Sequence, residues 1–371
     1  MLYISRLKKL QSYLKSEKCD AILIENPLNV FYLTGLNLSA GKLLVHSAGA
    51  HLIVDNRYFE LCQKASPYPV LQAPNPSFEI HLSRPDFSSI NKLAFDSEST
   101  SYKNYLDIEK YIEKTNQVSK NHRKLSLVPL ENPVKLLRTI KDEFEIDILR
   151  EAAALGSKGF DFVCSLLKED IRECEVAMEL EIFWKRHGGK SVAFDPIIAF
   201  GANTSMPHYR AGNEKLKKGH PVLIDIGVNY KHYHSDMTRV VYFGEPDPRI
   251  REIYAIVQKA QELALEKCRP GITLGELDGA ARDYITAQGF GAQFTHSLGH
   301  GVGLEIHELP VIRKTSSAKE MALSPGMVIT IEPGIYLPGV GGVRLEDMVV
   351  ITAEGYENLT LREIPSDPKI K

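Results

Sequence analysis

Two stretches of this chain align without gaps at an offset of 101 residues and share the same residue at several positions. The coinciding pairs are Arg150/Arg251, Glu151/Glu252, Ala154/Ala255, Ile171/Ile272, Glu175/Glu276 and Gly188/Gly289. Apolar residues in both stretches recur at helical intervals, which predicts a helix pair in each. The predicted helices span 142–168, 175–187, 248–268 and 273–289. A register shared by two helices and their connection favours internal repetition over a chance match. We therefore predict a domain of two related halves with a cleft between them.

β-type stretches with acidic residues inside apolar runs follow each helix pair. They are 221–230 and 237–243 in the first half, and 327–336 and 342–352 in the second. Their carboxylates are Asp225, Asp236, Glu332 and Glu346. An ionised group inside a strand is taken out of water and needs a partner or a metal ion. Any one of these acids could be a surface residue or a salt-bridge partner, but all of them together would repel one another unless cations lay between them.

The first two acids, Asp225 and Asp236, flank a predicted turn at 230–234, which would place them side by side on neighbouring strands. Histidines gather in one glycine-rich segment, which contains His296, His300 and His307 but no HExxH motif of a zinc-protease helix. Alternation with a period of two would put His296 and His300 on one strand face, so that His300 points at the carboxylates. One imidazole among carboxylates is an oxygen-rich ligand set, which suits a pair of Mn²⁺ or Co²⁺ ions better than thiolate-bound zinc.

The front of the chain has a different pattern. Short apolar runs separated by Gly, Pro and Ser predict a small α/β domain over 1–125. Its strands are expected at 21–24, 43–45, 52–54 and 93–95. The segment 116–133 is polar and carries prolines, so we predict a linker there and a second domain over 134–371. A length of 371 residues is compatible with this division.

Composition excludes several classes of protein. Lys and Arg number 45 against 47 Asp and Glu, a net charge of −2, so no basic surplus is available for nucleic acid. The N-terminus mixes charge with apolar residues, unlike a signal peptide, and no apolar run approaches a membrane span. The five scattered cysteines form no CxxC pair and are expected to be reduced thiols. We therefore expect a cytoplasmic protein that binds neither nucleic acid nor a membrane.

At this point the chain resembles a known family, the pita-bread dinuclear metallopeptidases (M24), which include methionine aminopeptidase and prolidase. The resemblance rests on Asp225, Asp236, His300, Glu332 and Glu346, within the phrases His-Ser-Leu-Gly-His-Gly-Val-Gly, Ile-Glu-Pro-Gly and Gly-Val-Arg-Leu-Glu-Asp. The N-terminal phrases Asn-Pro-Leu-Asn-Val-Phe-Tyr-Leu-Thr-Gly and Val-Asp-Asn-Arg-Tyr are similar to those of the Xaa-Pro branch, aminopeptidase P and prolidase. The resemblance implies an N-terminal creatinase-like α/β domain followed by a pseudo-two-fold pita-bread catalytic domain, α/β (α+β) in class.

The resemblance also implies roles for the ligand residues. Asp225 would bind one of two divalent metal ions, Asp236 and Glu346 would bridge both, and His300 and Glu332 would complete the other. Mn²⁺ is the expected metal, with Co²⁺ or Zn²⁺ as alternatives. Two such ions about 3.5–4 Å apart could share a hydroxide that attacks the scissile carbonyl, with Glu332 as general base.

Four further residues receive roles in the same way. His307 would donate to the developing oxyanion, and His208 would lie near the scissile nitrogen and bind substrate. His296 would contribute to the substrate pocket. Arg344, two residues before Glu346 and so on the same strand face, would hold a ligand carboxylate from outside the ligand shell.

The expected activity is hydrolysis of the Xaa-Pro bond, either at the N-terminus of peptides or in dipeptides, which no motif separates. The expected substrates are short peptides with proline at the second position, and the expected assembly is a homodimer. Alternatives are a methionine or broad-specificity aminopeptidase of the same fold, a creatinase-type amidinohydrolase and a non-catalytic peptide-binding module. The full ligand set argues against the last two.

Overall fold

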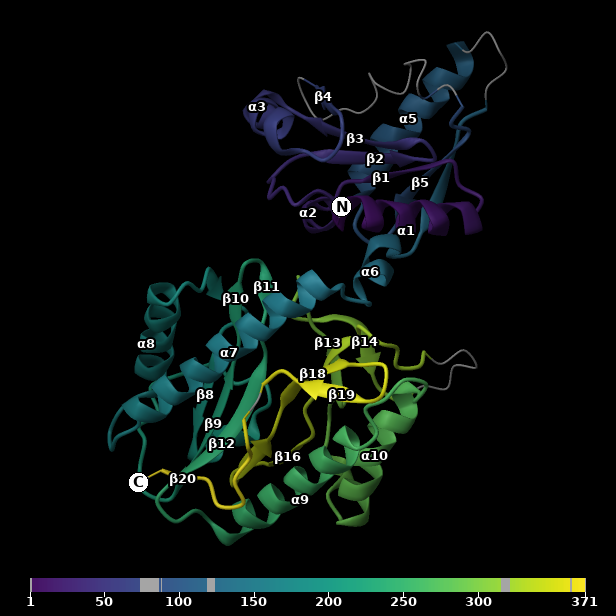
Figure 1. Cartoon of the computed structure of the whole chain (residues 1–371). Coiled ribbons are helices and arrows are strands. Elements are labelled where there is room, and N and C mark those ends of the chain that lie inside the picture. The colour runs from purple at the N-terminus through teal and green to yellow at the C-terminus, as the bar shows by residue number, and fades with distance from the viewer. Residues whose placement is uncertain are drawn as a thin grey trace. The chain divides into compact units, whose positions relative to one another are not determined.

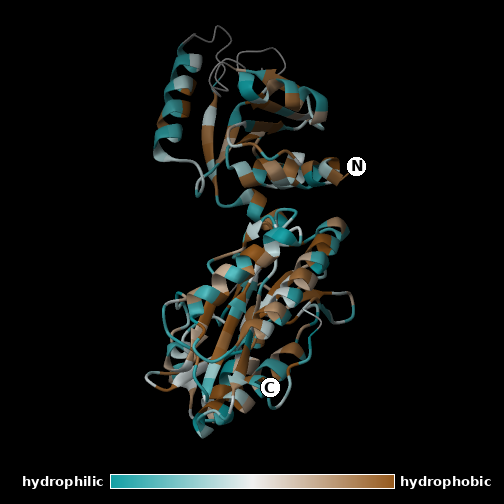
Figure 2. Ribbon diagram, turned by 90° about the vertical axis from the view of Figure 1, so that its left-hand side faces the viewer, coloured by the Kyte–Doolittle hydropathy of each residue, from teal (hydrophilic) through white to brown (hydrophobic). Residues whose placement is uncertain are grey.

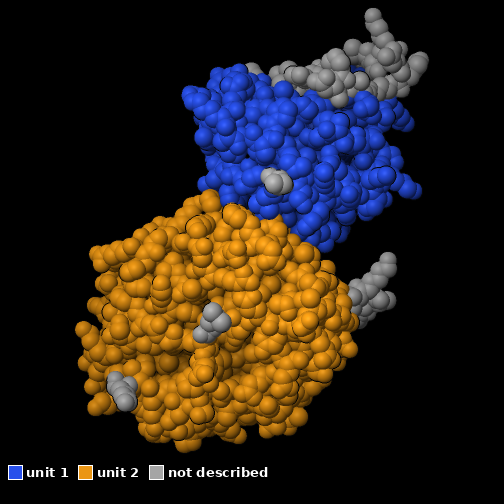
Figure 3. Space-filling model, in the orientation of Figure 1, with its two compact units in different colours: residues 1–137 blue, residues 138–371 orange. Residues whose placement is uncertain are grey.

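The computed structural model describes residues 2–73, 87, 89–118, 124–314, 321–360 and 362–370. These residues form two compact units, Met1–Leu137 and Arg138–Lys371, which are coloured separately in Figure 3. Each unit has its own sheets and its own hydrophobic core, and the two are taken in turn. No helix in the described ranges has the length and apolar character needed to cross a membrane.

The first unit is an α/β domain (Figure 1). Its elements are α1 (Leu2–Ser16), β1 (Ala21–Ile24), α2 (Pro27–Thr34), β2 (Lys42–His46), β3 (Gly49–Val54), α3 (Asn56–Ala65), β4 (Val70–Gln72), β5 (Lys92–Asp96), α5 (Tyr102–Val118), β6 (Ser126–Leu130) and α6 (Pro133–Arg138), whose last residue begins the second unit. Among the described residues the sheet has the order β4-β3-β2-β1-β5-β6. The strands predicted from apolar runs are all present, each extended by up to three residues.

The predicted linker over 116–133 is wrong in part. Helix α5 continues to Val118, and residues 126–130 form strand β6, which pairs in parallel with β5. Pro129 lies within this strand, opposite Phe95. An edge strand tolerates proline because only one side of its backbone is hydrogen-bonded. Composition therefore marked the segment as irregular although it completes the sheet, and residues 119–123 lie outside the described ranges.

The helices of the second unit confirm the predicted repeat. They are α7 (Glu143–Leu166), α8 (Glu173–Arg186), α9 (Pro248–Leu265) and α10 (Leu274–Ala287). Helices α8 and α10 lie 101 residues apart at both ends. In each, the third residue, Glu175 or Glu276, accepts from the backbone amide of the residue before the helix. Gly188 and Gly289 follow them with φ of 91° and 89°, a conformation that favours glycine.

The strands of the second unit form several small sheets. They are β7 (Ser191–Val192), β8 (Ile197–Phe200), β9 (His220–Ile226), β10 (Val228–Tyr230), β11 (Tyr233–His234), β12 (Met237–Phe243), β13 (Gly299–Gly301), β14 (Glu308–Ile312), β15 (Val328–Ile331), β16 (Gly334–Leu337), β17 (Gly341–Arg344), β18 (Asp347–Ile351), β19 (Tyr356–Asn358) and β20 (Lys369–Ile370). In the described chain the strand orders are β11-β10-β7, β20-β12-β9-β8, β14-β13-β15-β18-β19 and β16-β17. Of the four predicted stretches only 237–243 is one unbroken strand, and each of the others is divided in two.

Strand β9 is buried on both faces and separates two hydrophobic clusters. Val222 and Ile224 pack in the cluster formed with α7 and α8, whereas Leu223 packs in the cluster formed with α9, α10 and β15 to β18. Figure 2 shows the strands of this unit as largely hydrophobic and its helices as mixed. Because side chains alternate along a strand, Asp225 shares the face of Leu223 and is directed toward the second half of the unit.

Two glycine-to-alanine substitutions should change the stability of the second unit in opposite directions. A Cβ on Gly159 of α7 would lie 2.7 Å from Nε1 of the buried Trp184 on α8. Overpacking of this kind costs about 1–3 kcal/mol, so Gly159→Ala should lower the free energy of unfolding. A Cβ on Gly279 of α10 would meet its nearest atom, Asp283 Oδ2, at an ordinary 3.5 Å. Gly279→Ala should therefore raise the free energy of unfolding by about 0.4–1 kcal/mol.

Urea unfolding followed by tryptophan fluorescence measures both effects. Trp184 is the only tryptophan in the chain, so the signal reports the second unit alone. Equal changes in the two variants would contradict the close packing of α7 on α8.

Candidate metal centre

Strands β9 and β12 bring the first two acidic residues together. The strands are antiparallel with Asp225 opposite Thr238, and Asp236 is the residue immediately before β12. The intervening hairpin turns at Lys231 and His232, whose φ angles of 49° and 76° are those of a two-residue turn. The hairpin therefore brings Asp225 of β9 near Asp236, which lies just outside β12 and not within a strand as the sequence predicted.

The two glutamates come from breaks in strands, not from strand interiors. Glu332 follows β15, and Glu346 lies between β17 and β18, so of the four acids only Asp225 lies within a strand. The expectation of strand-internal carboxylates is therefore wrong for the others. At each break the backbone amide finds a partner elsewhere: Glu332 donates to Leu298 O at 2.8 Å and Glu346 to Thr238 O at 3.1 Å. The main chain is satisfied while the side chain leaves the sheet.

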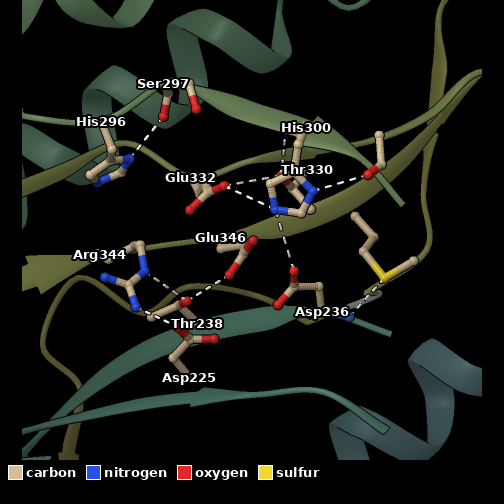
Figure 4. Close-up of polar contacts among 12 residues, drawn as sticks. Asp225, Asp236, Thr238, His296, Ser297, His300, Thr330, Glu332, Arg344 and Glu346 are labelled. Atoms are coloured by element: carbon tan, nitrogen blue, oxygen red, sulfur yellow. Dashed lines mark hydrogen bonds and ion pairs between the residues drawn. The ribbon is translucent and has the colours of Figure 1, made fainter. Parts of the chain in front are cut away.

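His300 of β13 faces the carboxylates (Figure 4). Its Nε2 lies 3.6 Å from Asp236 Oδ2 and 3.4 Å from Glu332 Oε1. One ligand atom from each of Asp236, His300 and Glu346 lies within 4.8 Å of the others. Figure 4 shows the carboxylates converging on the space below the imidazole.

The imidazole of His300 is neutral, and its Nε2 is available as a metal ligand. Its Nδ1 donates to Gly301 O at 3.0 Å, and burial lowers the pKa of the imidazole to about 4. The ring is therefore neutral near pH 7, and the nitrogen that faces the carboxylates carries a lone pair. A lone pair directed at carboxylate oxygens is an unfavourable contact unless a metal cation or a proton lies between them.

The carboxylates themselves are electrostatically strained. Burial, followed by the charges of the neighbouring acids, raises the pKa of Asp236 and of Glu332 well above the usual range and that of Glu346 to about 8. Arg344 offsets part of this charge, because its Nη2 lies 2.5 Å from Asp225 Oδ2. One guanidinium does not balance four buried carboxylates.

An unpaired carboxylate oxygen shows that these residues suit divalent cations. The second oxygen of Asp225, Oδ1, is buried and has no hydrogen-bond partner. Buried polar atoms almost always have one, so this oxygen is free to act as a ligand. Carboxylate oxygens with one imidazole nitrogen are donors that Mn²⁺, Co²⁺ and Zn²⁺ accept.

The three outer histidines lie around this centre with different burial. The ring of His307 stacks edge-on to that of His300, with centroids 4.4 Å apart. His208 is exposed. The pKa of His307 is lowered mainly by burial and then by the charge of His208. Burial also lowers the pKa of His296 to about 4, and His208 makes the smallest contribution to that shift. Of the three, His307 contacts His300 directly, and His208 is near enough to act electrostatically on His307 and His296.

The reasoning that placed His296 on a strand face was wrong. Strand β13 begins only at Gly299, so a period of two does not reach residue 296. Instead His296 Nε2 is 2.9 Å from the hydroxyl of Tyr336. The same hydroxyl accepts from Arg344 Nη1 at 2.7 Å, which links His296 to the residue that binds Asp225.

Sequence reasoning missed three side chains of the centre. Thr238 donates to Glu346 Oε2 at 2.6 Å, and Thr330 donates to Glu332 Oε1 at 3.3 Å. Both threonines stand two residues from a proposed ligand, a spacing that puts them on the same side of an extended chain. No sequence spacing marks Tyr336, because it comes near Arg344 only through the pairing of β16 with β17.

A fourth missed residue, Glu173, anchors the segment that carries His208. It is fully buried at the start of α8 and accepts from Phe200 N at 2.8 Å, Asn203 Nδ2 at 3.0 Å, Tyr209 Oη at 2.7 Å and Gly212 N at 3.0 Å. One buried carboxylate thus holds both ends of the segment 200–212.

Metal-free protein should lose stability as the pH rises. The folded pKa of Glu346, about 8, lies above an unfolded value of about 4.3. A group with a raised folded pKa contributes stability that is present below its unfolded pKa and is lost as the pH rises through the folded value. Asp236 and Glu332 shift in the same direction. In chelator, the free energy of unfolding should fall between about pH 5 and about pH 8.

Saturating Mn²⁺ should remove this loss, since a ligand at about a hundredfold over its Kd stabilises by about 2.7 kcal/mol. Urea titrations at both pH values, with chelator or with Mn²⁺, measure the effect. Glu346→Gln should flatten the pH dependence in chelator and weaken the response to Mn²⁺. Equal stability under all four conditions would contradict a cation site among these carboxylates.

The comparisons with known proteins agree with this geometry. The model of the Creatinase/Prolidase N-terminal domain matches residues 6–140, and that of Metallopeptidase family M24 matches residues 147–353. The chain is 38% identical over 362 residues to the Xaa-Pro dipeptidase of Pyrococcus furiosus, covering 96% of this chain and 98% of that protein.

Solved structures match over nearly the whole chain. The Xaa-Pro dipeptidase from Bacillus anthracis has a TM-score of 0.90 at 35% identity, covering 98% of this chain and 99% of that one. The prolidase from Pyrococcus horikoshii OT3 has a TM-score of 0.85 at 36% identity, covering 97% and 99%. These matches confirm the predicted fold class and the resemblance, and they imply divalent metal ions. The chain belongs to metallopeptidase family M24.

Proposed function

We propose that this protein hydrolyses the peptide bond between a first residue and a following proline, in dipeptides and at the N-terminus of short peptides. The observation that carries the proposal is the gathering of four carboxylates, three of them buried, beside the neutral imidazole of His300. Relatives and solved structures named Xaa-Pro dipeptidase or prolidase, similar over nearly the whole chain, support the choice of substrate.

In this proposal Asp225, Asp236, His300, Glu332 and Glu346 hold two divalent ions. Mn²⁺ is the first choice, and Co²⁺ and Zn²⁺ suit the same donors. When bound, such ions polarise a scissile carbonyl and lower the pKa of a water molecule that attacks it. Arg344 keeps Asp225 in place through its guanidinium and leaves Oδ1 of that carboxylate for a ligand role.

Glu332 is the proposed general base. Thr330 Oγ1 donates to Glu332 Oε1, which leaves the second oxygen of the carboxylate to take a proton from the attacking water. Glu332 lies at the end of β15, before Pro333, so its backbone position is fixed by the sheet on one side and by the ring on the other.

The outer histidines act on the substrate. His307, packed against the His300 ring, is proposed to donate to the oxygen of the scissile carbonyl as negative charge develops there. His208 is proposed to lie near the nitrogen that leaves with proline. His296, oriented by the Tyr336 hydroxyl, is proposed to line the pocket for the substrate.

A substrate panel tests the function. The purified chain loaded with Mn²⁺ should cleave Xaa-Pro dipeptides, and the rate should vanish with chelator and return with Mn²⁺ or Co²⁺. Comparison with Xaa-Pro-Xaa separates dipeptidase from aminopeptidase, and Met-Ala-Xaa reports a methionine or broad specificity. Creatine turnover would favour the amidinohydrolase instead, and absence of any bound metal would favour the non-catalytic module.

Substitution of one ligand gives the second test. Asp236→Ala should lower kcat/KM for an Xaa-Pro dipeptide by about a thousandfold or more, because residues that act as one unit fail together. Lys259→Ala is the matched control, since this exposed lysine on α9 contacts Glu262 of the same helix. A fully active Asp236→Ala enzyme would contradict the metal centre.

We also propose that the protein is a cytoplasmic homodimer. The proposal rests on the similarity to the Xaa-Pro branch over both domains. Light scattering coupled to size-exclusion chromatography, at a chain mass of 41.6 kDa, distinguishes a dimer from a monomer.

A further inference from the structure

A second group of buried charges lies outside the proposed ligands. Glu308, the first residue of β14, has a buried carboxylate that contacts two buried cations. Arg138 Nη2 donates to Glu308 Oε1, and Lys141 Nζ lies 3.3 Å from Glu308 Oε2. These cations lower the pKa of Glu308 against the opposing effect of burial, so the carboxylate is ionised. The proposed reaction has no use for this charge.

Glu308 and its two cations contact one short loop, residues 302–307, which joins β13 to β14. Oε1 of Glu308 accepts from the backbone amide of Glu305 at 3.0 Å, and the Glu305 carboxylate is 2.6 Å from Arg138 Nη2. A Cβ on Gly303 would lie only 2.8 Å from Glu308 Oε2 and 3.1 Å from Lys141 Cε. The loop therefore packs its backbone directly on the ion pairs.

The loop begins and ends at residues of the proposed site. Gly301, next to His300, pairs with Glu308, and the register of the two strands shifts at this point. His307 is the last residue of the loop and is bonded to Glu308 along the chain. The distance of 4.4 Å between the His300 and His307 rings is thus set by a loop whose other end is fixed by Glu308.

We infer that Glu308, clamped between Arg138 and Lys141, is a positioning residue that holds the loop 302–307 so that His307 faces the reacting carbonyl. The inference rests on the proposed function, because it assigns to Glu308 an effect on hydrolysis that passes through His307. Glu308 touches no substrate in this account. It acts by fixing the backbone from which a hydrogen-bond donor is presented, and a displacement of about 1 Å at such a donor can cost a hundredfold in rate.

A double-mutant cycle of Glu308→Gln and His307→Ala tests the inference on an Xaa-Pro dipeptide. In the otherwise unchanged enzyme, Glu308→Gln should lower kcat by about tenfold to a hundredfold with little change in KM, as expected when an interaction made only in the transition state is lost. In the His307→Ala background the same substitution should change kcat by less than about threefold, because residues that act as a unit are not additive.

Two further variants separate positioning from general loss of stability. Gly303→Ala should displace the Glu308 carboxylate without removing its charge and should show the same dependence on His307. Glu145→Gln is the control: it alters another buried carboxylate, which binds the Tyr233 hydroxyl at 3.0 Å, and should leave kcat unchanged. Hydrogen exchange of the amides in 302–308, measured without substrate, should quicken in Glu308→Gln and Gly303→Ala.

The outcomes distinguish failure of the proposed function from failure of the positioning role of Glu308. If the unsubstituted enzyme cleaves no Xaa-Pro peptide, the proposed function is overturned. If that enzyme is active but Glu308→Gln costs the same factor with and without His307, the positioning role is overturned. If Glu308→Gln does not fold, Gly303→Ala in the same cycle gives the answer, and unchanged exchange of the loop amides also overturns the inference.

Discussion

Burial of like charges is the constraint on which the second unit depends. Asp225, Asp236, Glu332 and Glu346 are removed from water with Arg344 as the guanidinium that contacts one of them. Every neighbouring polar group is arranged to reduce the resulting repulsion. Hydroxyls of Thr238 and Thr330 donate to the glutamates, and burial keeps the imidazole of His300 neutral. A divalent cation is the partner that this arrangement requires.

Strand β9 explains how the two halves meet at these charges. Its Val222 and Ile224 secure it to α7 and α8, and its opposite face carries Leu223 and then Asp225 toward the strands of the second half. The second helices of the two pairs, α8 and α10, repeat with the same bounds, yet the halves supply different proposed ligands. The first provides two aspartates from a hairpin, and the second provides glutamates from breaks between strands and a histidine from β13.

Local patterns predicted what is local. Helices α7 to α10 were predicted because periodicity and capping residues lie within each helix. The breaks in the strands were not, because Glu332 and Glu346 leave their sheets where Leu298 and Thr238, remote in sequence, accept from their amides. Tyr336 and Glu308 escaped for the same reason, since their partners are brought near by pairing of strands and by packing. The proposed ligands were predicted from their residue types and from resemblance.

The burial of the proposed ligand carboxylates has a consequence for how such a scaffold can change in evolution. Hydrophobic side chains of β9, β12 and β15 support the sheets, whereas the ligands contribute charge that the fold must tolerate. Exchange of a proposed ligand carboxylate for a neutral residue would abolish the proposed hydrolysis and reduce the electrostatic repulsion among the acids. Activity and stability are therefore opposed at these positions. A homologue that lost the metal ligands would keep a stable fold that could still bind peptides without cleaving them.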